Sequence, residues 1–318
     1  MLDYDKNNCI YRPNQSKVIA SKEVVMPIVF ILLWSSGYIF AEMGLQTNTP
    51  LAFVMVRLLF ACLILAAILF FQRRVLRISW QKITQMSLTG IFLQGFYQLF
   101  AFTAMYNGVS PGILAIILGA QPIATALFTR ESMVISQIAG LILGLIGLIL
   151  TVSNTLFMGT NSASSVLYCF LSLFGITVGT ILQKKYCSSQ PLTVNLFTQY
   201  LASFIFIFIL YLILDKQPVQ WSEQFIIALS WMVIIVSLAS TFSFYFLLKN
   251  RAIVNFTSYL YCVPPVTALM DYFIFHRALP GASIIGMVLI MLGLWLILKK
   301  TNSPINDGQV HQQADPLR

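Results

Sequence analysis

The chain has 318 residues, of which 58% are hydrophobic and only 9% are Asp, Glu, Lys or Arg. Soluble globular proteins carry about 25% charged residues, so this composition excludes an ordinary soluble enzyme, a nucleic-acid-binding protein and a disordered chain. The formal net charge of +9 fits a membrane protein, because Lys and Arg collect in the cytoplasmic loops of such proteins.

Apolar stretches long enough to cross a bilayer follow one another along most of the chain. A spanning helix needs roughly 20 mainly apolar residues. Two stretches without Asp, Glu, Lys, Arg or His, 83–129 and 132–183, are each long enough for two helices. Breaks are predicted at Asn107–Pro111 and at Ser153–Asn154, because Asn, Gly, Ser and Pro mark turns. The two stretches therefore predict four spans.

Six further spans complete the prediction of an all-α integral membrane protein with ten transmembrane helices. They are Val24–Glu42, Pro50–Phe71, Pro191–Leu214, Glu223–Leu248, Val254–Phe275 and Pro280–Leu298. Residues 1–23 and 301–318 are polar and are predicted to be cytoplasmic tails without regular structure.

The basic residues predict the orientation. With the N-terminus in the cytoplasm, all 19 Lys and Arg residues fall in cytoplasmic segments except Lys216, Arg277 and Arg57. Positively charged loops stay on the cytoplasmic side, so both termini are predicted to be cytoplasmic. The net charge then needs no nucleic acid to explain it.

The two halves of the chain share a pattern of prolines and glycines. Asn107 precedes Pro122 by 15 residues, and Asn250 precedes Pro265 by 15. The glycine pairs Gly140 with Gly147 and Gly286 with Gly293 are both seven apart.

Each half, 24–152 and 162–300, holds five predicted spans. An odd number means that the second half enters the membrane in the opposite orientation. Inverted repeats of this kind are typical of secondary transporters, whose binding site lies near the midplane between the repeats.

Several motifs resemble those of the EamA family in the drug/metabolite transporter superfamily. They are Leu33–Tyr38 in the first span, Pro50 followed by Arg57, Ala104–Asn107 and Gly119–Pro122. The resemblance extends over about residues 24–300. It implies a bacterial inner-membrane carrier of small solutes such as amino acids, metabolites or toxic compounds, usually an exporter, and either a monomer or a weak homodimer.

Arg57 is the strongest candidate for a site residue because it is a charged residue within a predicted span. Such a charge is costly unless it faces a cavity or a partner, so it marks a functional site by default. A guanidinium fits a carboxylate through two parallel hydrogen bonds. The alternative is a structural pairing with Glu42 or with a backbone carbonyl.

Polar and aromatic side chains supply further candidates. Gln94, Tyr97 and Gln98 share one face of the third span, and this face is predicted to turn inward because amides and phenols need partners in lipid. Asn255, Ser258, Tyr259 and Cys262 repeat this spacing on the ninth span. The candidate solute contacts besides Arg57 are Trp34, Tyr38, Gln94, Tyr97, Gln98, Gln121 and Tyr259. Hydrogen bonds between helices and aromatic packing are the alternative roles.

Three prolines and two carboxylates complete the candidates. Pro122, Pro264 and Pro265 lie in the middle of matching spans, where proline bends a helix, and are predicted to serve a gate or a static bend. Glu42 and Asp271 are the carboxylates in the predicted spans that could couple transport to protons.

These observations predict a secondary transporter that exports small organic solutes, such as amino acids or related metabolites, by alternating access. A multidrug or nucleotide-sugar carrier of the same superfamily is the alternative, and an integral membrane enzyme is a weaker one. No ATP-binding motif, cofactor or metal site is expected from the sequence.

Overall fold

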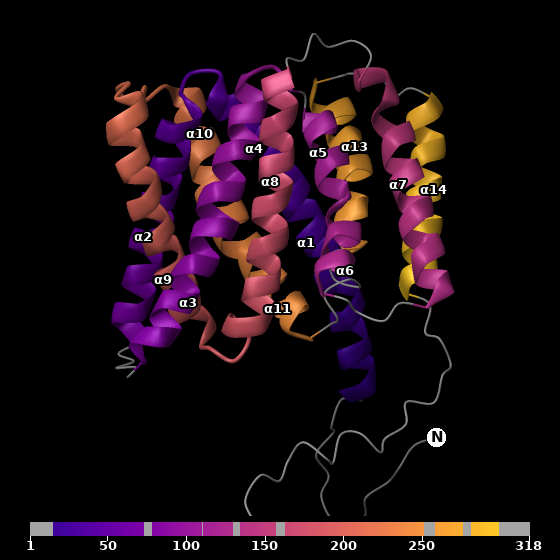
Figure 1. Cartoon of the computed structure of the whole chain (residues 1–318), viewed down its shortest axis with the longest axis horizontal. Helices are drawn as coiled ribbons and strands as arrows, with labels where there is room; N and C mark the ends of the chain where they lie inside the picture. The colour runs from indigo at the N-terminus through magenta and orange to yellow at the C-terminus, as the bar shows by residue number, and fades with distance from the viewer. Residues whose placement is uncertain are drawn as a thin grey trace, which may run out of the picture.

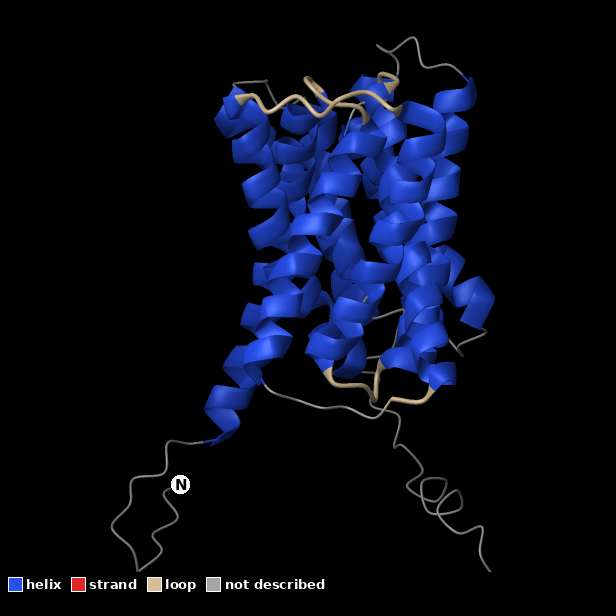
Figure 2. Cartoon of the chain, turned by 90° about the vertical axis from the view of Figure 1, so that its left-hand side faces the viewer, coloured by secondary structure: helices blue, strands red, loops and turns tan. Residues whose placement is uncertain are grey.

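The computed structural model describes most of the chain, and within the described ranges it is built from helices joined by short loops, without a β-strand (Figure 2). The described residues are 15–72, 78–109, 111–129, 134–156, 163–250, 258–275 and 281–298.

The helices follow one another in chain order. Those before residue 160 are α1 (Gln15–Leu45), α2 (Pro50–Gln72), α3 (Trp80–Gly90), the π-helix η1 (Ile91–Phe96), α4 (Tyr97–Tyr106), α5 (Pro111–Gly119), α6 (Gln121–Thr129) and α7 (Ile135–Leu156). Those after it are α8 (Ala163–Leu182), η2 (Gln183–Cys187), α9 (Leu192–Leu210), η3 (Tyr211–Asp215), α10 (Glu223–Trp231), η4 (Met232–Ser240), α11 (Thr241–Asn250), η5 (Ser258–Cys262), α13 (Val263–Phe275) and α14 (Gly281–Leu298).

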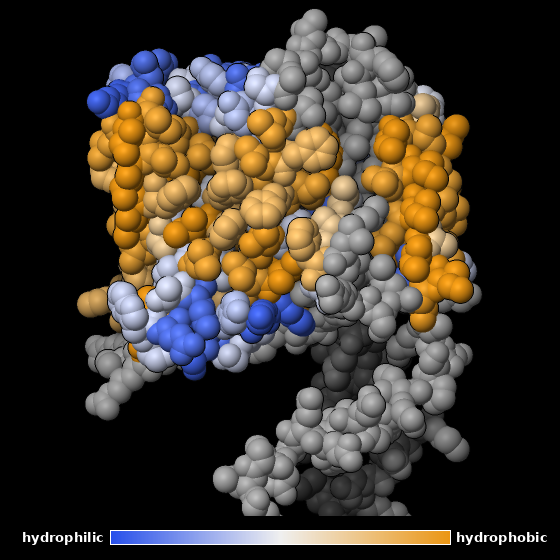
Figure 3. All heavy atoms as spheres, in the orientation of Figure 1, coloured by the Kyte–Doolittle hydropathy of each residue, from blue (hydrophilic) through white to orange (hydrophobic). Residues whose placement is uncertain are grey.

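Six helical segments in the described part of the chain are long and apolar enough to cross a membrane. They are Val25–Leu45, Pro50–Gln72, Trp80–Tyr106, Leu167–Cys187, Leu192–Asp215 and Glu223–Leu248. Figure 3 shows the matching surface, an apolar band between two hydrophilic ends. The prediction of a helical membrane protein is thus confirmed, whereas the number of ten spans stays a prediction.

Two predictions at helix ends are wrong. The residues before Val24 are predicted to lack regular structure, but α1 begins at Gln15, while its apolar span begins at Val25, one residue from the predicted start. Gln, Lys, Ala and Glu dominate its first turns, and these residues favour helices without any help from packing. Helix α7 continues past Ser153–Asn154 to Leu156, because Ser and Asn weaken a helix that has already formed without ending it.

The predicted break at Asn107–Pro111 is confirmed. Helix α4 ends at Tyr106 and α5 begins at Pro111. Between them Gly108 has a φ of 89°, a left-handed conformation that glycine adopts at little cost.

The packing joins helices from the two parts of the chain. Helix α2 packs on α9, and α7 packs on α14, at opposite edges of the bundle in Figure 1. Helix α1 packs on α10 and η4, while α8 packs on α4 and η1. Each of these pairs brings together helices from before and after residue 160.

Glycines bring α7 and α14 into backbone contact, because small residues let two helices approach closely. A Cβ added to Gly140 would lie 2.6 Å from the carbonyl oxygen of Gly293, and one added to Gly147 would lie 2.6 Å from that of Gly286. No side chain fits at either position, so the two helices touch through their main chains.

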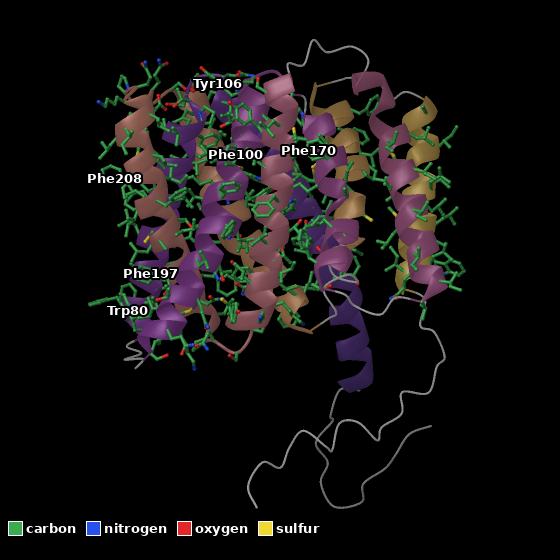
Figure 4. All side chains as sticks on the ribbon, in the orientation of Figure 1. Trp80, Phe100, Tyr106, Phe170, Phe197 and Phe208 are labelled. Carbon is green, nitrogen blue, oxygen red and sulfur yellow. The ribbon has the colours of Figure 1, made fainter. Side chains whose placement is uncertain are left out.

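Aromatic side chains mark both ends of the segment formed by α3, η1 and α4. Trp80 is exposed at its start and Tyr106 at its finish, and Figure 4 shows them near opposite ends of the bundle. Trp and Tyr favour the two interfaces between membrane and water, which fits a segment that spans the bilayer.

Two loops are bonded to each other at one end of the bundle. We call this contact, between residues 46–49 and 215–224, the loop clasp. Asn48 Nδ2 donates to the Gln220 carbonyl oxygen at 3.0 Å, and the Gln220 N–H donates to Asn48 Oδ1 at 2.9 Å. Three side-chain pairs complete the clasp, namely Thr49 with Asp215, Ser222 with Thr47, and Gln224 with Gln46.

Replacing Asn48 with Ala should loosen the clasp, because both hydrogen bonds to Gln220 are lost. We expect a cost of about 1–3 kcal/mol and faster hydrogen exchange at the Gln220 amide, measured by mass spectrometry in detergent. Gln224→Ala removes an exposed pair and serves as the control, with little expected change. Unchanged protection of Gln220 in Asn48→Ala would contradict the structural role of the clasp.

Candidate functional site

A cavity lies inside the bundle between α1, α2, η1, α4 and η4. It is lined by Trp34, Gly37, Tyr38, Ala41, Arg57, Gln94, Tyr97, Gln98, Ala101, Phe102, Met105, Leu114, Met232, Val236 and Thr241. We call it the central cavity. Six of the predicted solute contacts line it, namely Trp34, Tyr38, Arg57, Gln94, Tyr97 and Gln98.

Arg57 is 3% exposed and supplies the cationic side chain of the central cavity. Its Nε donates to Ser237 Oγ at 2.8 Å, and its guanidinium carbon lies 6.0 Å from the centre of the Phe102 ring. In the described part of the chain no salt bridge to Arg57 is found, and Ser237 is its hydrogen-bond partner. The alternative of a structural pairing with Glu42 or a backbone carbonyl stays a prediction. A buried cation without a counter-ion is costly, and an anionic ligand would remove that cost.

Gln94 and Gln98 form a pair of amides on the cavity wall. Gln98 Nε2 donates to Gln94 Oε1 at 2.7 Å, and Gln98 Oε1 is buried without a hydrogen-bond partner among the described residues. The cavity therefore offers an acceptor beside the Arg57 cation. The π-helix η1 carries Gln94 and joins directly to α4, which carries Gln98. Single π-turns are frequent at functional sites.

Aromatic rings form another wall of the central cavity. Trp34 stacks on Phe244 with the ring centres 5.7 Å apart and an angle of 19° between the planes. Tyr38 and Tyr97 are also buried and line the central cavity together with Trp34. Such rings offer an apolar surface with polar edges, which suits a solute that is part apolar and part charged.

A second, smaller cavity adjoins the first, since Trp34 and Tyr38 line both. We call it the side cavity. Its other lining residues are Leu118, Gly119, Gln121, Ile176, Leu260, Val263 and Pro264. Gln121 and Pro264 of the predicted site thus lie here and not in the central cavity.

The remaining predicted residues lie elsewhere. Tyr259, Pro122 and Pro265 are buried outside the lining of both cavities. Glu42 is half-buried near the end of α1 and also lies outside both linings. The side chain of Asp271, and the whole of Asn255, lie outside the described part of the chain.

Ser258, Tyr259 and Cys262 are predicted to share one face of an α-helix, and this prediction is wrong. These residues form the 3₁₀-helix η5 directly before α13, and a 3₁₀-helix has three residues per turn. Pro264 and Pro265 follow it, and proline cannot donate the α-helical hydrogen bond. In the other half the break at Ala120, between α5 and α6, similarly precedes Pro122.

Sequence reasoning missed Ser237, the partner of Arg57, and the apolar lining residues Phe102, Met105, Met232 and Val236. It also missed a buried network around Gln199. The amide of this residue donates to Gln183 Oε1 at 2.6 Å and to Asn195 Oδ1 at 2.8 Å, and accepts from the Tyr245 hydroxyl. The signal was present, since amides within apolar segments need internal partners.

Comparisons with known proteins place this geometry among transporters. A model of the EamA-like transporter family matches residues 21–153 and, a second time, residues 163–299. The uncharacterized transporter YvbV of Bacillus subtilis is 24% identical over 280 residues, covering 86% of this chain and 90% of that protein. Protein PagO of Salmonella typhimurium is 25% identical over 303 residues, covering 89% and 96%.

An uncharacterized transporter of Archaeoglobus fulgidus is 23% identical over 292 residues, covering 88% of this chain and 98% of that protein. A chain of known crystal structure shares the fold, with a TM-score of 0.71 and 18% identity. That similarity covers 87% of this chain and 96% of the other.

Proposed function

The chain belongs to the EamA-like transporter family, and from this premise we propose that it is a secondary transporter for small organic solutes that carry a carboxylate, such as amino acids or related metabolites. We propose that it exports them across a bacterial inner membrane. The observation that carries the substrate class is Arg57, a buried cation in the wall of the central cavity that has no counter-ion among the described residues. A solute carboxylate would supply the missing charge.

The remaining chemistry of the central cavity supports an amphipathic solute. Gln98 Oε1 has no hydrogen-bond partner among the described residues, and an N–H or O–H group of the solute would supply the donor. Trp34 and Tyr97 offer aromatic surface to an apolar side chain. Nucleotide sugars fit less well, because two phosphates call for more cations than Arg57.

Lipophilic drugs are a second candidate, favoured by one observation. Met105, Met232, Phe102 and Val236 also line the central cavity, and methionine adapts its shape to varied ligands. For such drugs Arg57 would favour anionic over cationic compounds.

For the architecture we propose ten spans in two inverted repeats, 24–152 and 162–300, with both termini cytoplasmic. The twofold family match supports two repeats. The packing supports a twofold relation between the halves, because exchanging them turns the pairing of α1 with η4 into that of α8 with η1, and leaves the pairs α2–α9 and α7–α14 unchanged. Transport would then proceed by alternating access, with the helix breaks before Pro122 and Pro264–Pro265 as gates.

We propose Glu42 and Asp271 as the carboxylates that could couple transport to protons. We further propose that the protein is a monomer or a weak homodimer in the lipid bilayer. A pH jump applied to proteoliposomes containing Glu42→Gln or Asp271→Asn tests the coupling. If both variants respond like the wild type, neither residue carries the proton.

Counterflow tests the function itself. Purified protein is placed in liposomes preloaded with a mixed pool of amino acids, carboxylic acids and amines, and mass spectrometry reports which species exchange. We expect exchange of carboxylate-bearing members and none of amines that lack a carboxylate. Exchange of the amines alone would contradict the role of Arg57, and exchange only of added lipophilic anions would favour the drug carrier.

A further inference from the structure

The side cavity lies where two broken helices meet. The break between α5 and α6 contributes Leu118, Gly119 and Gln121, and the junction between η5 and α13 contributes Leu260 and Pro264. Its lining includes no charged side chain among the described residues. What this cavity can bind therefore depends on its neutral oxygen atoms.

Gln121 is completely buried, and its hydrogen bonds fix the direction of its amide. Its Nε2 donates to Thr180 Oγ1 at 3.1 Å, while the Thr180 hydroxyl donates to the Ile176 carbonyl oxygen at 2.7 Å. Because the Thr180 proton is already used, Thr180 can only accept from Gln121. The amide oxygen is thereby turned away from Thr180, and Gln121 Oε1 is buried without a partner in the described part of the chain.

Two backbone carbonyls add to this oxygen. Pro122 has no N–H, so the carbonyl of Leu118, four residues earlier, lacks its α-helical donor. Leu260 lies in the 3₁₀-helix η5, where its carbonyl accepts from the N–H of residue 263, and Pro264 removes only the additional α-helical donor. Both Leu118 and Leu260 line the side cavity. The two halves of the chain thus each supply one carbonyl with a lone pair that the helix does not use.

We propose that the side cavity binds a compact monovalent cation through Gln121 Oε1 and the carbonyl oxygens of Leu118 and Leu260. The occupant is either an alkali metal ion or the primary ammonium group of the solute. Neutral amide and carbonyl oxygens are the ligands by which proteins replace the hydration shell of such ions. Unwound carbonyls at broken helices hold coupling ions in other transporter folds.

The second form of this proposal rests on the proposed function. A solute with its carboxylate at Arg57 and its ammonium group at Gln121 would extend from one cavity into the other past Trp34 and Tyr38, which line both. In the first form an alkali ion binds independently of the solute. Both forms depend on the same three oxygen atoms.

The test is thermal unfolding of the purified full-length protein in detergent. The chlorides of sodium, potassium and methylammonium are compared with N-methyl-D-glucamine chloride at equal ionic strength. We expect at least one small cation to raise the Tm saturably, by roughly 2–4 °C. A response to sodium or potassium alone identifies a metal-ion site, and a response to methylammonium alone identifies the solute ammonium group.

Three variants test whether the cation response depends on Gln121. Gln121→Leu should abolish the response, and Gln121→Glu should lower the half-maximal cation concentration about tenfold. Thr177→Val removes a buried hydroxyl without a described partner outside both linings, and should respond like the wild type. If Gln121→Leu does not fold, an unchanged concentration dependence in Gln121→Glu overturns the proposal.

The proposal is also overturned if no cation shifts the wild-type Tm or if Gln121→Leu responds like the wild type. Its failure is separate from failure of the proposed function. Amino-acid exchange in counterflow without any cation response would exclude this site and leave the function intact. A metal-ion response without amino-acid exchange would keep the site and exclude the substrate class.

Discussion

Arg57→Lys should retain the folded protein at wild-type levels and lose most solute exchange. Lysine keeps the charge, but it has no Nε–H to bond Ser237 at 2.8 Å and cannot make a second parallel hydrogen bond to a carboxylate. Hydrogen bonds of charged groups are worth about 1.5–3 kcal/mol, so the apparent affinity should fall roughly 10–100-fold. Initial rates of counterflow over a range of solute concentrations measure this directly.

Ser237→Ala is the matched control for Arg57→Lys. It removes the bond that positions the guanidinium and leaves the guanidinium itself, so its loss of affinity should be smaller. Elution as a single peak in size-exclusion chromatography checks folding for both variants. Wild-type exchange by Arg57→Lys would show that Arg57 serves the structure and not the solute.

Gly147→Ala should reduce the stability of the protein clearly, although it adds only one methyl group. The added Cβ would lie 2.6 Å from the carbonyl oxygen of Gly286 and 2.9 Å from the backbone nitrogen of Ile290. Both atoms belong to the main chain of α14, so α7 and α14 must separate along their contact. Overpacking costs about 1–3 kcal/mol, and we expect the Tm to fall by several degrees.

Gly281→Ala is the control for this prediction because it adds the same methyl group to α14. A Cβ at Gly281 meets no atom within 4 Å, so the Tm should stay constant or rise slightly, since alanine favours the helix. Equal Tm values for Gly147→Ala and Gly281→Ala would contradict the close approach of α7 and α14.

Local sequence patterns predicted much of the fold. Hydropathy predicted the apolar segments, and turn residues predicted the break after Tyr106. The partner of α7 was not predicted, because glycines that allow close packing do not specify which helix they face. The starts and ends of helices were harder to predict, as α1 and α7 show. Helix propensity changes only by small amounts from residue to residue near a helix end.

Part of the candidate site could also be predicted from hydropathy. Polar groups in an apolar segment have to face the interior, so Arg57, Gln94 and Gln98 could be expected to face the interior and proved to share a cavity. Their partners could not be predicted, because Ser237 is one of many serines in apolar segments and pairs with Arg57 from a distant helix. Nor does any residue pattern signal the π-helix at Gln94.

The contact between α7 and α14 also has a consequence for how the protein is made. Gly140 and Gly293 touch, although about 150 residues separate them in the chain. At a synthesis rate of about 5–20 residues per second, α7 waits roughly 10–30 s in the membrane before its partner exists. Its glycine face can close only when the last described helix has emerged from the ribosome, which makes this pairing a final step of biogenesis and the step most exposed to premature termination.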